Sequence, residues 1–479
     1  MTTLTQQLTA EELNPIDDVD RHLPGLRAAL DGPSIQPLLE AALGVYEPVV
    51  SCVAEQCLYV GDSCVIRYAV DIAGQRTVLT GRLFADARSS AALLRDSLEP
   101  LAGRMERASL PGLESLVGAV PGLPMVLHAF PIDAELPALI EATDPQWMVE
   151  LFRRVIPDAL DQELNISGCS VEPVHYGRRH RCVLRYAINA RDAAGVRQPL
   201  TAYGKVAADA EGALAGPIIS ALRTHGTVRV PRSLGYLPAE RLALFEGIPG
   251  VPRVAQILRE RIAGTPAAPG SPTLEKAIAA CAGVAAQLHE SGIELGPARR
   301  IEDDLATLRG ALQPITSVSG PFADRLNTCL SVAESRAAAD RLPMGLAHGD
   351  FSYTQLIFDE DRVGLVDFDT VCHAEPALDL GHFLAYLDFA GRKGGGLDRR
   401  RLTAEMREHF LATYIDEREL GEADARQVLD RTAVYELVSL LRLAIHAWQK
   451  LKPRRLRLIV DALEDHMSGS ANANPRRSR

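Results

Sequence analysis

The residues with the clearest chemical potential lie between positions 348 and 369, where two acids and an amide follow at short intervals. His348-Gly349-Asp350 comes first, Gln355 follows five residues after Asp350, and Asp367-Phe368-Asp369 ends a short apolar run. Phosphoryl transfer from ATP needs a carboxylate that accepts the proton of the attacking hydroxyl, and a metal held by acid and amide oxygens. Asp350 suits the first task, and Gln355 with Asp367 suits the second. The pattern therefore predicts phosphoryl-transfer chemistry.

Two apolar runs around an acidic turn should bring these side chains together. Residues 356–358 and 363–366 flank Asp359-Glu360-Asp361, which is typical of a β-hairpin. Such a hairpin places Asp350 and Gln355 before its first strand and Asp367 after its second, so all three meet at one end. Mg²⁺ binds one or two carboxylates together with phosphate oxygens and water. A surface loop followed by an ordinary hairpin is the alternative, but the ordered combination is far more specific than His-Gly-Asp alone.

On these motifs the chain resembles the aminoglycoside phosphotransferase and choline kinase-like family, small-molecule kinases with a protein-kinase-like fold. The resemblance implies that Asp350 is the catalytic base and that Asp367 and Gln355 hold Mg²⁺. It also implies that His348 and Asp379 support the catalytic loop. Gln355 departs from the Asn that is usual in the family and is one methylene longer. The implied fold is α+β and bilobal, with a small antiparallel-sheet N-lobe and a mostly helical C-lobe.

Segments upstream resemble the nucleotide-binding half of such a kinase. Lys205 lies in a strand-like run at 200–206 and resembles the lysine that pairs with the ATP phosphates, and Glu211 is its candidate partner. Glu246 and Ile248 fall in a run that resembles the last N-lobe strand and the adenine-binding hinge. A solvated lysine and an ordinary first-turn acid are the alternatives for Lys205 and Glu211. ATP and Mg²⁺ are the expected cofactors.

The glycine-rich loop of protein kinases is missing before Lys205. The corresponding hairpin should be residues 174–186, whose turn at 177–181 is basic and carries a single glycine. Its backbone and arginines could contact phosphates through charge-assisted hydrogen bonds, or the turn could be solvated. No Walker A sequence occurs, which disfavours a P-loop kinase.

An internal repeat divides the first half of the chain. The run at 64–70, CVIRYAV, recurs at 182–188 as CVLRYAI, and three further segments match in the same order. A period this long indicates duplicated domains rather than a solenoid. Arg82 occupies the position of Lys205, so the first copy should be a degenerate N-lobe-like module. It could act as a lid, a dimerisation surface or an effector-binding module, or merely cover apolar surface.

These patterns predict five parts of the chain. They are an N-terminal segment (1–35), the degenerate module (36–145), a kinase-like N-lobe (146–250), a helical C-lobe with the catalytic and metal motifs (251–468), and a disordered tail (469–479).

Composition narrows the class of protein and its partners. The formal net charge of −11 argues against a nucleic-acid binder, and eight scattered cysteines without metal-site spacing suggest buried thiols in a reducing compartment. The N-terminus lacks the basic start and apolar core of a signal peptide, and no apolar run approaches membrane-spanning length. We expect a cytoplasmic protein without nucleic-acid or membrane partners, and a possible homodimer through the first module.

The acceptor is the least defined part of the prediction. Glu436 and Trp448 lie in a helical stretch where the resembling family often builds its acceptor pocket, although both also suit a core. The predicted function is transfer of the γ-phosphoryl group of ATP to a hydroxyl of a small molecule: an amino sugar, an aminoglycoside, a sugar or an amino alcohol. A pseudokinase-like regulator and an interaction protein built on the first module are the alternatives.

Overall fold

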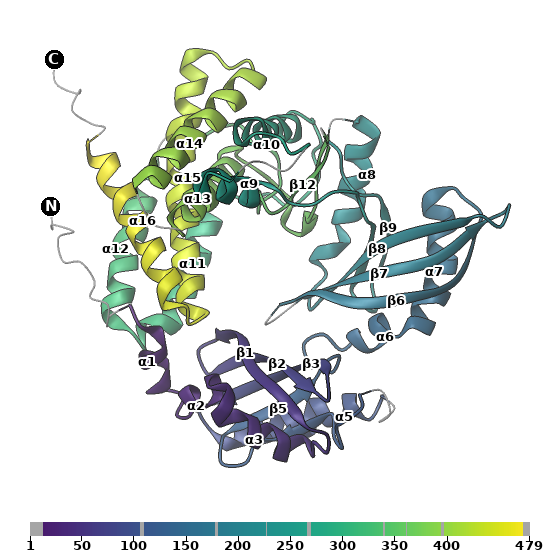
Figure 1. Cartoon of the computed structure of the whole chain (residues 1–479). Helices are drawn as coiled ribbons and strands as arrows, with labels where there is room; N and C mark the ends of the chain where they lie inside the picture. Colours follow the sequence, from purple (N-terminus) through teal and green to yellow (C-terminus); the bar gives the residue numbers. More distant parts are fainter. Residues whose placement is uncertain are drawn as a thin grey trace.

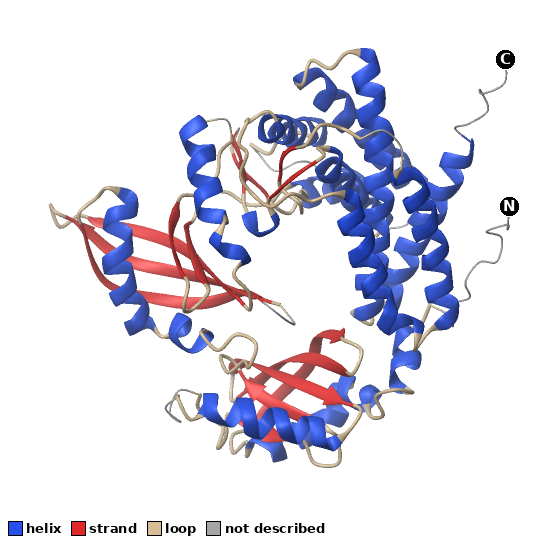
Figure 2. Cartoon of the chain, turned by 180° about the vertical axis from the view of Figure 1, so that it is seen from behind, coloured by secondary structure: helices blue, strands red, loops and turns tan. Residues whose placement is uncertain are grey.

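In the computed structural model, the protein consists of three units, namely two sheet-containing modules and a helical lobe (Figure 1). The structure describes residues 13–105, 110–177, 181–226, 228–265, 270–338, 341–360, 362–393 and 397–472. Both sheets are antiparallel, and helices make up nearly all of the third unit (Figure 2). This is the expected bilobal α+β fold, preceded by a second sheet module.

The first module has a five-stranded sheet in the order β1-β2-β3-β5-β4. Its elements are α1 (Pro15–Asp20), α2 (Leu26–Leu30), α3 (Gly32–Leu43), β1 (Val49–Tyr59), β2 (Ser63–Ile72), β3 (Gln75–Phe84), α4 (Ala87–Leu93), the π-helical η1 (Leu94–Leu98), α5 (Glu99–Ala102), β4 (Val117–Ala119) and β5 (Met125–Ala129).

The second module repeats this arrangement as β6-β7-β8-β10-β9. Its elements are α6 (Leu139–Thr143), α7 (Pro145–Leu160), β6 (Leu164–Tyr176), β7 (Arg181–Asp192), β8 (Arg197–Ala207), the short η3 (Glu211–Ala213), α8 (Ala215–His225), β9 (Ser233–Leu237) and β10 (Leu242–Glu246).

Matching side-chain contacts support the duplication of the two modules. The hydroxyl of Tyr68 on β2 donates to the carbonyl of Ala29 at 2.7 Å, and that of Tyr186 on β7 donates to Ala142 at 2.9 Å. Each tyrosine thereby ties the central strands to the short helix before α3 or α7. Arg82 and Lys205 also occupy the same register, since their partners across the sheet are Val65 and Val183.

The helical lobe carries two small two-stranded sheets among its helices, the hairpin β12-β13 and the pair β11-β14. Its elements are α9 (Val254–Ala263), α10 (Leu274–His289), α11 (Ile301–Thr316), α12 (Gly320–Ala337), β11 (Gly345–Ala347), β12 (Leu356–Asp359), β13 (Arg362–Leu365), η4 (Phe368–Thr370), β14 (Cys372–Ala374), α13 (Ala377–Arg392), α14 (Leu397–Glu417), α15 (Glu422–Gln449) and α16 (Pro453–Asn472). Within the described residues, no helix is both long enough and apolar enough to cross a membrane.

The first module touches both of the other units (Figure 1). On the C-lobe side, the Tyr59 ring meets Trp448 edge-on at 5.7 Å, and the apolar core of the first module is continuous with that of the C-lobe. On the N-lobe side, the Arg67 guanidinium donates to the carbonyl of Gly177, at the end of β6, over 2.5 and 3.2 Å. The first module therefore bridges the two lobes.

Candidate active site

A cleft of about 440 Å³ lies between the second module and the C-lobe, a volume within the usual range for small-molecule sites. Lys205 from β8 reaches it from one side, and Gln355 and Asp367 reach it from the other. Apolar residues line the rest, namely Val174, Val183, Ile219, Phe245, Ile248, Val251, Ile357, Val366 and Phe368. The cleft thus combines an apolar slot with a charged end.

The hairpin predicted after the catalytic loop is present as β12 and β13. Leu356 pairs with Leu365, and the amide of Val366 donates to the carbonyl of Gln355 at 3.0 Å, so the hairpin continues up to the site. The Gln355 side chain in turn donates to an Asp367 carboxylate oxygen at 3.0 Å. Asp367 adopts a left-handed φ of 73°, which turns the chain sharply after β13. The hairpin therefore places the Gln355 amide next to the Asp367 carboxylate.

Lys205 lies between two carboxylates. Its Nζ is 2.5 Å from Asp367 Oδ1 and 2.7 Å from Asp369 Oδ2, and Arg181 approaches Asp369 at 3.3 Å. Burial lowers the pKa of Lys205, but the two acids outweigh it and the net pKa is raised. Burial likewise raises the pKa of Asp367, yet Lys205 and Arg181 bring it below its usual value. Lys205 and Asp367 are therefore both charged at neutral pH.

The structure does not test the predicted pairing of Lys205 with Glu211. Its backbone begins the short η3, but its side chain lies outside the described part of the structure. The acids that contact Lys205 among the described residues come instead from the Asp367-Phe368-Asp369 turn.

Asp350 lies in the loop after β11, beside His382 of α13. The His382 Nε2 is 2.9 Å from Asp350 Oδ1. Burial raises the pKa of Asp350, but His382, His348 and Arg442 lower it well below the usual value for an aspartate. The carboxylate is therefore ionised and able to accept a proton from a nearby hydroxyl. His382 was not predicted to contact Asp350, although its place three residues after Asp379 puts both on one helix face.

Asp379 fixes the backbone of the loop that carries Asp350. It accepts hydrogen bonds from the amides of His348 at 2.7 Å and Gly349 at 2.8 Å, and His289 Nε2 lies 3.1 Å away. The His348 ring contacts the carbonyl of Val366 at 3.0 Å. Burial raises the pKa of Asp379, but the hydrogen bond from His289 and the neighbouring groups lower it overall. An ionised, buried acid thus fixes the loop that carries Asp350.

The two predicted hinge residues, Glu246 and Ile248, both line the cleft. The chain then pairs with the hairpin, because Val251 and Phe358 exchange backbone hydrogen bonds of 3.0 and 2.9 Å. Gly250 has φ 113°, and a Cβ there would come within 2.3 Å of the Phe358 carbonyl oxygen. The predicted hinge therefore lies directly against β12, the strand that follows Gln355.

The structure does not bring the two predicted acceptor residues to Asp350. Trp448 is fully buried, where it packs against Tyr59 and stacks on Phe322. Glu436 is 2 % exposed, forms an ion pair with Arg407, and lines a different pocket between α13, α14, α15 and α16. The helical pattern identified α15, but it could not tell which face of this largely buried helix meets the site.

The donor set suits a magnesium ion that also binds phosphate oxygens. Gln355 and Asp367 share one corner of the cleft, and the Asp369 Oδ1 atom is buried without a hydrogen-bond partner. The described residues contain no group of three or more His, Cys, Asp or Glu that could hold a metal by themselves. A site with few protein ligands is typical of Mg²⁺ bound with a nucleotide, so the residues fit this ion.

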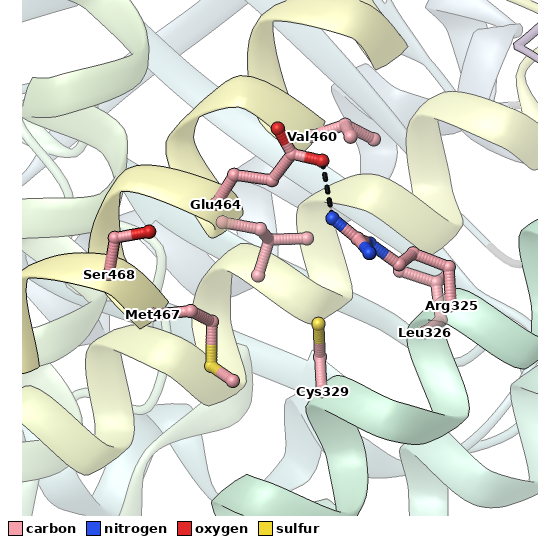
Figure 3. Close-up of a pocket in the computed structure, with 8 residues that line it drawn as sticks. Arg325, Leu326, Cys329, Val460, Glu464, Met467 and Ser468 are labelled. Carbon is pink, nitrogen blue, oxygen red and sulfur yellow. Dashed lines mark hydrogen bonds and ion pairs between the residues drawn. The ribbon is translucent and has the colours of Figure 1, made fainter. Parts of the chain in front are cut away.

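A second pocket, between α12 and α16, offers no comparable chemistry (Figure 3). Its volume is about 110 Å³, and the ion pair of Arg325 with Glu464, at 2.6 Å, runs along its side. Apolar residues and the buried Cys329 form most of the remaining lining. The cleft at Lys205 is therefore the candidate active site.

A two-lobed fold, a lysine facing two acids across a cleft, and a braced His-Gly-Asp loop define a kinase-like phosphotransferase. Comparison with family sequence models agrees, because residues 196–428 match the phosphotransferase enzyme family, whose model is called APH. Residues 196–428 belong to this family, and the predictions of the family and of a small-molecule kinase are confirmed. Comparison with curated proteins found no significant match.

Several solved structures are similar to this chain. An aminoglycoside phosphotransferase from Streptomyces rimosus, solved with ADP and streptomycin, has 20% identity and a TM-score of 0.36, covering 56% of this chain and 92% of its own. A choline kinase from Cryptosporidium parvum has 10% identity and a TM-score of 0.49, covering 68% and 95%. A glucosamine kinase solved with glucosamine, ADP and phosphate has 18% identity and a TM-score of 0.43, covering 60% and 93%. At these values none of them defines the substrate of this chain.

Proposed function

We propose that the protein transfers the γ-phosphoryl group of ATP to a hydroxyl of a small molecule. The observation that carries this proposal is the convergence of Lys205, Gln355 and Asp367 on one cleft, with the ionised Asp350 on the loop that leads into it. Adenine would lie in the apolar slot near Glu246 and Ile248, with the phosphates toward Lys205. The acceptor would approach Asp350 from the side of α13 and α15.

Each side chain has a separate task in this proposal. Asp350 orients the acceptor hydroxyl and takes its proton as the oxygen bonds to the γ-phosphorus, while the bond from that phosphorus to the bridging oxygen breaks and ADP leaves. Lys205 pairs with the phosphates. Gln355 and Asp367, with Asp369 beside them, would hold Mg²⁺, which when bound neutralises the charge of the triphosphate. Positioning and charge neutralisation supply most of the rate enhancement in this class of reaction.

The Asp350→Asn variant tests this assignment. The amide keeps the size of the side chain but cannot accept the proton, so we expect turnover to fall at least about 10²-fold while MgATP still binds. Release of ADP should be measured with a panel of sugars, sugar acids, amino sugars and amino alcohols, and binding should be followed by thermal shift. Ordinary turnover by this variant would show that Asp350 is not the base.

The remaining predictions about organisation are part of the same proposal. The division of the chain into five parts stays a prediction. The helices depart from three of its limits: α3 (Gly32–Leu43) begins before residue 36, α6 (Leu139–Thr143) is grouped with the second module, and α16 (Pro453–Asn472) continues past residue 468. The cytoplasmic location stays a prediction. A homodimer through the first module also stays a prediction, and the exposed Tyr46, Val50 and Val53 near its edge strand β1 are candidates for such a contact.

A further inference from the structure

One face of α13 leads away from the catalytic carboxylate. His382, Tyr386, Phe389 and Lys393 follow at intervals of four, three and four residues, so they share one side of the helix. The first of them contacts Asp350. None of the four lines the nucleotide cleft. This face therefore borders the acceptor side of Asp350 rather than the nucleotide side.

Cationic side chains lie at the end of this face that is farther from Asp350. The Lys393 ammonium lies 4.7 Å, and the Arg455 guanidinium 4.6 Å, from the centre of the Phe389 ring. Burial first, and then the charges of Arg455 and Arg259, lower the pKa of Lys393. The same two arginines act on Tyr353, which belongs to the catalytic loop. We call Arg259, Lys393 and Arg455 the cationic cluster.

The cationic cluster lacks acidic partners among the residues that the structure describes. In the part of the chain that the structure describes, no ion pair joins any of its three members to a carboxylate, and the buried Arg455 Nε has no hydrogen-bond partner. By contrast, Arg442 on α15, whose charge acts on Asp350, forms an ion pair of 2.5 Å with Asp304, which it shares with Arg299. Like charges held together without an acid are unfavourable, and an anionic ligand would offset their repulsion.

The cluster lies within reach of the reaction centre. Arg455 and Asp350 both act on the pKa of Tyr386, and both also act on His446 of α15. Along α13, Phe389 lies about 10 Å from His382, at 1.5 Å of rise per residue. A molecule of the size of a substituted sugar would span the distance from Asp350 to the cluster.

We propose that the cationic cluster binds an anionic group, a phosphate or a carboxylate, on the acceptor whose hydroxyl is presented to Asp350. The inference rests on the proposed function and specifies its acceptor. Guanidinium and ammonium groups bind such anions through charge-assisted hydrogen bonds, and Arg can do so with two parallel bonds. Tyr386 and Phe389 would contact the carbon skeleton in between. A polycationic acceptor would be repelled at this site.

Inorganic phosphate provides the first test. Thermal unfolding of the full chain should be followed in saturating MgADP, with and without phosphate, for the wild type, Arg455→Gln and Arg454→Gln. Arg454 is the exposed neighbour on the same helix, so its variant loses the same charge outside the cluster. We expect phosphate to stabilise the wild type and Arg454→Gln, and to bind Arg455→Gln about tenfold more weakly. Equal phosphate binding by the two variants, or none by the wild type, would overturn the proposal.

A set of related sugars provides the second test and shows whether the cationic cluster favours a phosphate or a carboxylate on the acceptor. ADP release should be measured with glucose, glucose 6-phosphate, glucuronate and glucosamine. We expect kcat/KM for at least one anionic sugar to exceed that for glucose by about tenfold or more, and Arg455→Gln to remove this preference. A preference for glucosamine, or an equal loss for all four sugars in Arg455→Gln, would overturn the inference. Stabilisation by MgATP reports the proposed function independently, because Arg455 lies outside the nucleotide cleft.

Discussion

The charge of Asp350 depends on a contact that its motif does not contain. Burial alone would raise the pKa of this carboxylate, and the His382 side chain, 2.9 Å away, is the first of the groups that reverse the effect. Because the folded pKa is lowered, the resulting stabilisation is present above the usual pKa of an aspartate and is lost as the pH falls through the folded value. His382 is therefore a positioning residue for the base proposed here.

Replacement of His382 should change the pH dependence of the reaction. In His382→Leu, burial of Asp350 persists and His348 and Arg442 remain, but the main group that lowers the pKa is gone, so the pKa of Asp350 should rise relative to the wild type. We expect the acid limb of the kcat/KM profile to move to higher pH, with a smaller change at alkaline pH. A remote His409→Leu variant on α14 serves as the control. An acid limb at the same pH in His382→Leu and the wild type would contradict this role.

At the scale of residues, the sequence identified the groups whose spacing is local. Asp350, Gln355 and Asp367 lie within a stretch of 18 residues, so their motif can be recognised without knowledge of the fold. Trp448 and Glu436 were different, because the choice of face on α15 depends on packing from segments far away in sequence, such as Tyr59. Such long-range contacts leave no local pattern.

At the scale of elements, the loop that carries Asp350 depends on a close approach between two backbone segments. Gly349 has φ 79°, and a Cβ there would lie 2.1 Å from the carbonyl oxygen of Thr370. Thr370 ends η4, so the loop that carries Asp350 and the turn after Asp367 are in direct contact. Glycine is needed for both the backbone conformation and the space.

The Gly349→Ala variant tests this contact. The new methyl group must push the two loops apart, and the left-handed conformation adds strain, so we expect a loss of about 2 kcal/mol or more in stability and a large loss of turnover. Gly122→Ala is the control, since Gly122 also has a positive φ, of 76°, but no atom within 4 Å of the added Cβ. Chemical unfolding and ADP release measure the two effects. Equal stability losses in the two variants would show that strain alone, not crowding, matters.

Elements with strong local patterns were predictable. The hairpin of β12 and β13 followed from two apolar runs around an acidic turn, and the duplication of the sheet modules followed from matching segments. The pairing of β11 with β14 could not be predicted, because these strands are three residues long and 24 residues separate them. Short strands of this kind form only when the surrounding fold brings them together.

At the scale of the whole molecule, the first module is joined to the end of β6 by a buried arginine. Arg67 is 3 % exposed, and its guanidinium lies 3.1 Å above the centre of the Tyr176 ring and donates to the Gly177 carbonyl. Asp133 accepts from the Tyr176 hydroxyl at 2.6 Å and lies 3.7 Å from Arg67. Gly177 directly follows β6 and begins the turn predicted to replace a glycine-rich loop, of which residues 178–180 lie outside the described part of the structure, so the first module helps to hold this end of β6.

Removal of this arginine should loosen the junction. In Arg67→Met, Asp133 and the Gly177 carbonyl lose a buried cation, and we expect a destabilisation of about 3 kcal/mol together with faster hydrogen exchange at the end of β6. Arg185→Met is the matched control, because Arg185 holds the equivalent position in the second module but pairs with Glu172 at the surface. If both variants behave alike, the Arg67 contact does not join the modules.

Magnesium-dependent binding of ATP tests the central claim that Lys205, Gln355 and Asp367 form one nucleotide site. Calorimetric titration should compare the wild type, Asp367→Ala and the control Asp359→Ala, whose carboxylate pairs with Arg229 and Arg362 in the hairpin. We predict that the wild type and Asp359→Ala bind ATP at least about tenfold more tightly with Mg²⁺ than without it, and that Asp367→Ala loses this difference. A wild-type chain that gains nothing from Mg²⁺, or an Asp367→Ala variant that keeps the full gain, would contradict the account.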